Sequence, residues 1–95
     1  DAQVIQGEVN DEERVGAQFS LIASDTRTQH IGGEAWLRQE YDVTLTKTHT
    51  HLHMAILATH HLGRGYVIIL TDDASTFASD DSSTFEPMLT SFRFK

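Results

Sequence analysis

Three histidines alternate along one short stretch of the chain, THTHLHM at positions 48–54. On a β-strand, His49, His51 and His53 would point to the same side, with successive side chains about 6.5 to 7 Å apart. Imidazole is a common ligand of zinc, copper and nickel, and Asp42 on a neighbouring strand would add an oxygen ligand. These residue types therefore permit a divalent metal site made of the four side chains.

The same alternation is also typical of one solvated face of a β-sheet. Thr44 and Thr46 would flank the histidines, where a metal site more often places carboxylates that orient the imidazole rings. Of the two interpretations, we favour the solvated face. A site for zinc or another divalent ion at His49, His51, His53 and Asp42 remains the alternative.

No other stretch of the chain carries a catalytic signature. The sequence has no nucleophile elbow, phosphate-binding glycine loop, metalloprotease helix or dinucleotide fingerprint. Asp72, Asp73, Asp80 and Asp81 lack the alternating oxygen ligands and the glycine of a calcium loop, so we expect them to be solvated. We therefore predict that the protein is not an enzyme and has no catalytic residues.

The composition narrows the class of partner. The 95 residues include 14 acidic and seven basic side chains, which gives a net charge of −7, and no cysteine. This charge disfavours nucleic acid and acidic membrane surfaces as partners.

The lack of cysteine excludes disulfides and thiolate metal sites. No apolar run is long enough for a transmembrane segment. We expect a single domain over residues 1–95.

Alternating apolar residues predict the sheet that carries the histidines. The pattern from 34 to 70 indicates antiparallel strands, with a turn at Lys47 and Thr48. The resulting pairs would be Val43 with Leu52, Tyr41 with Met54, Leu37 with Ala58, Asp42 with His53, Thr44 with His51, and Thr46 with His49. Apolar residues meet apolar ones in this register, and polar residues meet polar ones. The apolar run YVIIL at 66–70 predicts a central strand covered on both faces.

The two ends of the chain predict helices. Residues 1–13 place Val4, Ile5 and Val9 at helical spacing. Near the other end, Ser83 and Glu86 suggest a capping box. The apolar stripe that follows consists of Phe85, Met88, Leu89 and Phe92. The intervening acidic stretch at 71–83 is expected to be a solvated linker anchored by Phe77.

These elements predict an α+β domain. We expect an antiparallel sheet of about four strands, with an N-terminal helix and a C-terminal helix packed on it. The C-terminal helix should cover the apolar side of the sheet, with the N-terminal helix beside it. Residues 15–25 fit a strand through Phe19 and Leu21, and a helix is the alternative there. Trp36, Tyr41 and Tyr66 are expected in the core, or else lining a small groove.

The segments IGGEAWLRQEYD, GRGYVIIL and FEPMLTSFRF resemble the PsbP-like superfamily, which includes the oxygen-evolving accessory protein PsbP, a Ran-binding nuclear import protein and lipoproteins of the LpqN type. The resemblance covers residues 31–95. It implies a glycine-led strand, a hairpin and a closing helix, and roles that are mostly non-catalytic docking. Such domains are longer and carry an extra N-terminal strand pair. Its absence implies a truncated version, or a sequence that begins late, and would leave a sheet edge open to pairing.

Taken together, the residues and the resemblance predict a non-catalytic accessory or protein-interaction domain. Its protein partner is unknown, and a homodimer along an exposed sheet edge is one candidate. We expect it outside the cytoplasm or tethered to a membrane through a segment that precedes Asp1. The alternative function is a histidine-rich module that binds a divalent metal.

Overall fold

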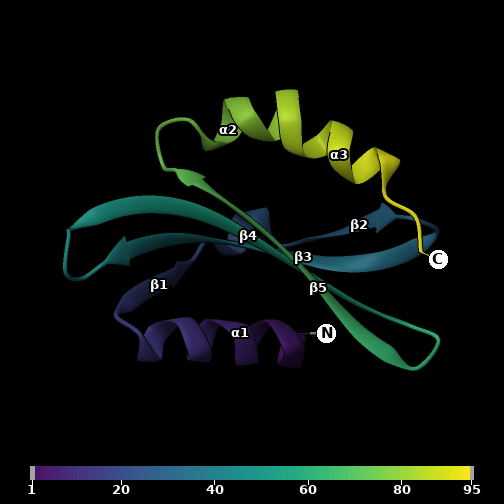
Figure 1. Ribbon diagram of the computed structural model, residues 1–95, viewed down its shortest axis with the longest axis horizontal. Helices are drawn as coiled ribbons and strands as arrows, with labels where there is room; N and C mark the ends of the chain where they lie inside the picture. The colour runs from purple at the N-terminus through teal and green to yellow at the C-terminus, as the bar shows by residue number, and fades with distance from the viewer. Residues whose placement is uncertain (1, 95) are drawn as a thin grey trace.

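The computed structural model describes residues 2–94, which form an antiparallel five-stranded sheet with helices on both faces (Figure 1). The predicted α+β class is confirmed, with five strands in place of about four. The elements are α1 (Ala2–Arg14), β1 (Ala17–Leu21), the 3-10 turn η1 (Ala23–Asp25), β2 (Arg27–Ile31), β3 (Glu34–Leu45), β4 (Thr50–His61), β5 (Arg64–Asp73), α2 (Phe77–Asp80), the π-helical turn η2 (Asp81–Phe85) and α3 (Glu86–Ser91).

The sheet is a meander with two unlike edges. Strands β3, β4 and β5 follow one another as antiparallel neighbours. Strands β1 and β2 both pair with β3, at opposite ends of it, and η1 separates them. One edge is therefore broken into two five-residue pieces. The other edge is β5, which is ten residues long.

Strand β5 is not the central strand that its apolar run predicts. Within residues 2–94 it pairs with β4 alone. Its run of apolar residues is only half explained by burial: Leu70 is buried, whereas Val67 is 41% and Ile69 39% exposed. An uninterrupted apolar run does not distinguish a covered strand from an edge strand with an uncovered face.

The predicted hairpin between β3 and β4 is confirmed, except that Thr46 and His49 lie in the turn and do not pair. The observed register pairs Tyr41 with Met54 and Asp42 with His53, as the sequence predicts. The preceding hairpin turns at Gly32 and Gly33, whose φ angles are 62° and 86°. Glycine adopts this left-handed region without the steric cost of a Cβ atom, which accounts for the pair at this position.

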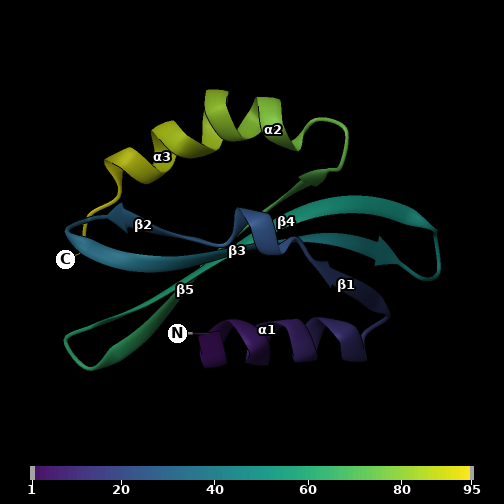
Figure 2. The same ribbon diagram turned by 180° about the vertical axis from the view of Figure 1, so that it is seen from behind.

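Different segments cover the two faces of the sheet, as Figures 1 and 2 both show. Helix α1 packs on one face through Ile5 and Val9. The other buried members of this first core are Ala17, Tyr41, Val43, Met54, Ile56 and Ala58. The C-terminal segment, defined here as residues 77–91, covers the opposite face. The second core consists of Ile31, Trp36, Ala55, Leu57, Leu70, Phe77 and Leu89.

The predicted placement of the helices is therefore wrong in one respect. The side of β3 with Tyr41 and Val43 lies under α1, and the C-terminal segment lies over the side with Trp36, Arg38 and Glu40. The helices are on opposite faces and not beside each other. The apolar pattern shows that a face is buried, but it does not show which helix buries it.

The C-terminal segment also begins earlier than predicted. Phe77 opens α2 and is buried, so the predicted anchor is confirmed. No side chain caps the start of α2, η2 or α3. The predicted capping box of Ser83 and Glu86 is wrong, because the helical turns run through Ser83 without a break and the carboxylate of Glu86 binds Arg38 and Gln29.

Candidate functional site

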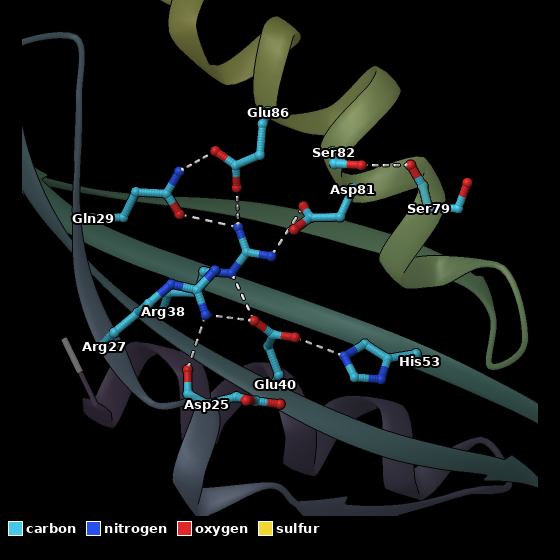
Figure 3. A network of polar contacts seen from close by, with 10 residues as sticks. All are labelled: Asp25, Arg27, Gln29, Arg38, Glu40, His53, Ser79, Asp81, Ser82 and Glu86. Carbon is cyan, nitrogen blue, oxygen red and sulfur yellow. Dashed lines mark hydrogen bonds and ion pairs between the residues drawn. The ribbon is translucent and has the colours of Figure 1, made fainter.

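A network of charged side chains lies between the sheet and the C-terminal segment (Figure 3). At its centre is Arg38 of β3, whose side chain is fully buried. Its Nε donates a hydrogen bond to Glu40 at 3.0 Å, and its Nη2 donates to Asp81 at 3.1 Å. Its Nη1 donates to Gln29 at 3.0 Å and to Glu86 at 2.9 Å. The guanidinium thus joins β2, β3, η2 and α3.

Arg38 remains charged in this position. Burial lowers its pKa, but the hydrogen bond and charge of Asp81, with the charge of Glu40, outweigh that effect and raise the pKa above its usual value. A buried cation is tolerated only when its donors are satisfied and its charge is balanced. Arg38 meets both conditions, which identifies it as a structural clamp on the C-terminal segment.

Glu40, two residues along β3, is the second buried charge. Its Oε2 accepts hydrogen bonds from Arg38 and, at 2.9 Å, from Arg27. Its Oε1 lies 2.7 Å from Nε2 of His53. Burial raises the pKa of Glu40, but the hydrogen bond from His53 and the charge of Arg38 outweigh it, and the pKa lies below its usual range. Because an ionised carboxylate only accepts hydrogen bonds, Nε2 of His53 is the donor.

His53 is turned inward, beneath the C-terminal segment. Its ring centroid lies 4.1 Å from that of Phe77. Its Nδ1 lies 4.0 Å from a carboxylate oxygen of Asp42, the residue that the sequence places opposite it. The imidazole therefore faces a carboxylate at each nitrogen, and Phe77 covers its plane.

The other two histidines of the alternating stretch lie elsewhere. His51 is exposed, with its Nδ1 3.3 Å from the hydroxyl of Thr44. His49 precedes β4 and lies in the turn, with a φ of 55°. The expectation that all three histidines share one solvated strand face is therefore correct for His51 and wrong for His49 and His53. The turn removes His49 from the strand, and Phe77 covers His53.

A pocket of about 350 Å³ opens beside this network. Asp25 of η1 lines it together with Glu40 and His53, and potential ligand atoms of these three residues lie within 4.8 Å of one another. In the described part of the chain this is the one group of three or more acidic, histidine or cysteine side chains that lie so close together. It includes His53 from the predicted metal site, but not His49, His51 or Asp42.

Sequence reasoning missed most of this network. Arg38 and Glu40 alternate with apolar residues, as solvated positions of a half-buried strand do. Asp81 was predicted to be solvated, yet it pairs with Arg38 at 3.1 Å. The only available signal was Trp36, which shares their side of β3 and is buried. A large buried aromatic residue on the polar side of a strand indicates that something covers that side.

The aromatic residues belong to the core, as predicted. Trp36 is buried, and its Nε1 donates to the carbonyl oxygen of Ile31 at 3.0 Å. Tyr41 is buried on the opposite face, where burial raises the pKa of its hydroxyl. Tyr66 is half-buried and lies against Phe94.

The exposed edge strand β5 is a second candidate site. On its outer side, backbone donors and acceptors have no strand partner among residues 2–94. Natural sheets protect such edges with short strands, bulges, prolines or charges. Strand β5 is RGYVIILTDD, which has no proline and places its charges only at the two ends.

The chain matches no protein-family model, and neither the curated proteins nor the solved structures contain a match for it. No helix within residues 2–94 combines the length and the apolar character that a membrane span requires.

Proposed function

We propose that this protein is a non-catalytic interaction domain that pairs with a second copy of itself along β5. The observation that carries this proposal is the unequal protection of the two sheet edges. The β1–β2 edge is interrupted by η1, whereas β5 is continuous, apolar and uncovered on its outer side. Adding a strand to such an edge satisfies backbone groups and covers apolar side chains together.

The sequence of β5 is complementary to itself in one antiparallel register. A twofold axis normal to the sheet must pair residues that face the same side, so it passes midway between two copies of one residue. When that residue is Ile68, Val67 lies opposite Ile69 of the partner subunit. These are the two exposed apolar residues of the strand, on the face that α1 covers. The pairing would remove both from water.

The charges at the ends of β5 agree with the same register. This register places Arg64 opposite the partner's Asp72. The pair occurs twice in the dimer and lies on the face of the sheet that the C-terminal segment covers. A hydrogen bond from Asp80 lowers the pKa of Asp72, so this carboxylate is ionised at neutral pH. Opposite charges on facing strands stabilise a pair, and like charges destabilise it.

The first experiment measures the oligomeric state by sedimentation equilibrium over a range of protein concentrations. We expect a monomer–dimer equilibrium for the wild type and a monomer for Ile69→Lys, because the lysine would face an apolar residue across the new strand pair. Val15→Lys is the matched control, since Val15 is exposed but lies after α1, far from β5 in the chain. A wild type that stays monomeric at every concentration would overturn the proposal.

A second experiment tests the register by charge reversal. Arg64→Glu and Asp72→Lys each create like-charge pairs at both ends of the interface, so each variant alone should dimerise more weakly. In a mixture of the two, opposite charges face each other again, and heterodimers should form. Circular dichroism of each variant checks that the fold is retained. Dimers of unchanged affinity in both variants would rule out this register.

The resemblance to the PsbP-like superfamily and a location outside the cytoplasm belong to the same proposal. In the structure a helix and two short strands precede three long antiparallel strands and a closing helical segment, and this order is compatible with the resemblance. Docking roles in that superfamily are consistent with an interaction domain. Determining the encoded sequence upstream of Asp1 tests the membrane tether, since a lipidation motif or an apolar span there would support it.

A further inference from the structure

We propose that Asp25, Glu40 and His53 bind one zinc ion at the mouth of the pocket beneath the C-terminal segment. The site is independent of the dimer, because all three ligands come from one protomer and none lies on β5. It also differs from the metal site that the alternating histidines suggest, with which it shares His53 alone.

The three ligands converge from three elements of the fold. Asp25 belongs to η1, Glu40 to β3 and His53 to β4. Figure 3 shows the carboxylate of Glu40 directed at the His53 ring, with Asp25 on the neighbouring turn. Their potential ligand atoms already lie within 4.8 Å of one another. Ligand atoms around a zinc ion with bonds of about 2.0 to 2.2 Å are roughly 3.3 Å apart, so side-chain adjustments suffice.

The donor set suits zinc. One imidazole nitrogen and two carboxylate oxygens are ligands that zinc accepts, and its usual coordination number is four. The adjoining pocket of about 350 Å³ leaves room for water at the fourth position. Calcium and magnesium prefer sites built from oxygen atoms alone, so the imidazole favours a transition metal over either of them.

Glu40 has one oxygen available for an ion. Its Oε2 is held by Arg27 at 2.9 Å and Arg38 at 3.0 Å, whereas Oε1 contacts Nε2 of His53 at 2.7 Å. A zinc ion would take the place of the hydrogen between Oε1 and Nε2. The bonds from the two arginines would remain and orient the carboxylate.

Phe77 restricts the orientation of His53, since the centroids of the two rings lie 4.1 Å apart. Zinc-binding histidines commonly donate their second N–H to a carboxylate. The nearest oxygen of Asp42 lies 4.0 Å from Nδ1 of His53, so a rotation of this exposed side chain would be needed to form that hydrogen bond. The surroundings of His51 differ, since its Nδ1 lies 3.3 Å from the hydroxyl of Thr44.

The positive charges nearby set a limit on the affinity. Arg27 and Arg38 repel a cation placed on the other oxygen of Glu40, while Asp81 also lines the pocket and attracts it. Arg38 is buried and is needed for the fold, but the side chain of Arg27 is 46% exposed. Arg27→Gln removes one repulsive charge, and the bond from Arg38 still orients the carboxylate of Glu40, so we expect this variant to bind zinc several-fold more tightly.

The test is calorimetric titration of the tag-free protein with zinc chloride. We expect one ion per chain for the wild type, and loss of this binding in His53→Gln and in Asp25→Asn. His51→Gln is the matched control, because His51 is on the same strand and the same side, and it should bind as the wild type does. Circular dichroism without zinc checks that each variant is folded.

Two outcomes of the titration would contradict the proposed zinc site. Absence of stoichiometric binding by the folded wild type would overturn it. Binding that survives His53→Gln but is lost in His51→Gln would assign the ion to the exposed histidines instead. The monomeric variant Ile69→Lys should bind zinc unchanged, and this result separates the zinc site from the proposed dimer.

Discussion

The two faces of the sheet are held to their helices by different kinds of contact. Under α1 the buried residues form an apolar cluster around Ile5, Val43 and Ile56. Under the C-terminal segment an apolar cluster around Leu57 and Leu89 lies beside a network of buried and half-buried charges. Apolar burial depends mainly on area and tolerates small shifts, whereas charged hydrogen bonds require particular partners at particular distances. Helix α1 is therefore held mainly by buried apolar area, whereas the C-terminal segment also depends on charged hydrogen bonds of particular geometry.

A charged network is stabilising only while it is complete. Moving charges out of water costs several kcal/mol per ion, which their mutual attraction offsets when every donor and acceptor is satisfied. Within residues 2–94 no buried side-chain nitrogen or oxygen lacks a partner. The face under the C-terminal segment should therefore be far more sensitive to the loss of a single polar partner than the face under α1.

The largest effect is expected for Arg38→Met. Removing the guanidinium leaves Glu40 buried with fewer partners and releases Asp81 and Glu86, so the free energy of unfolding should fall by about 3 to 5 kcal/mol. Urea denaturation measures this loss. Hydrogen exchange should accelerate over residues 77–91 more than in α1.

The double variant Arg38→Met with Glu40→Met is the control for this prediction. It removes both buried charges, so it should recover much of the lost stability. A loss of less than about 1 kcal/mol in the single variant, as for a solvent-exposed ion pair, would contradict the clamp.

Ile5→Ala tests the opposite face and should have the next largest effect. Ile5 is fully buried between α1 and the sheet, and truncating such a side chain costs about 2 to 4 kcal/mol through lost burial and the cavity left behind. Hydrogen exchange should now accelerate in α1 and not over residues 77–91. Val15→Ala, at an exposed position, should change stability by less than about 0.5 kcal/mol. Equal acceleration on both faces would mean that the two faces do not act separately.

The face under α1 was the more predictable of the two. Val4, Ile5 and Val9 recur at helical spacing, and Tyr41 and Val43 alternate along β3. Both periods follow directly from the geometry of helix and strand. The register with β4 also follows from sequence, because a shift by one residue would turn Tyr41 and Met54 to opposite faces.

The charged face could not be read from the sequence in the same way. Arg38 and Glu40 have the spacing of solvated residues, and their partners Asp81 and Glu86 lie more than 40 positions further along the chain. Local periodicity contains no information about such distant pairs. His53 illustrates the result, since it belongs to the same alternating stretch as His51 but is covered by Phe77.

Glu40→Gln should have a smaller and pH-dependent effect. The pKa of folded Glu40 lies below its usual value near 4.5. Its contribution to stability is therefore present above the pKa of the unfolded chain and is lost as the pH falls through the folded pKa. At neutral pH the variant should lose about 1 to 3 kcal/mol, because the amide carries no charge for Arg38 and Arg27.

Urea denaturation at a series of pH values measures this dependence. The difference in stability between wild type and Glu40→Gln should shrink as the pH falls below about 4.5. Glu8→Gln replaces a carboxylate of α1, which packs on the opposite face of the sheet, and it should not change the pH dependence of stability in this way. A difference that stays constant from neutral to acid pH would show that the charge of Glu40 does not contribute to the free energy of unfolding.

The smallest effects are expected for the two histidines on the covered side of β4. His53→Ala removes the hydrogen bond to Glu40 and the contact with Phe77, and should cost about 1 to 2 kcal/mol. His51→Ala removes an exposed side chain and should change stability by less than about 0.5 kcal/mol. Because the two residues share a strand and a side, their difference locates the boundary of the area that the C-terminal segment covers. Urea denaturation of both variants without added metal measures it, and equal losses would mean that this boundary does not fall between them.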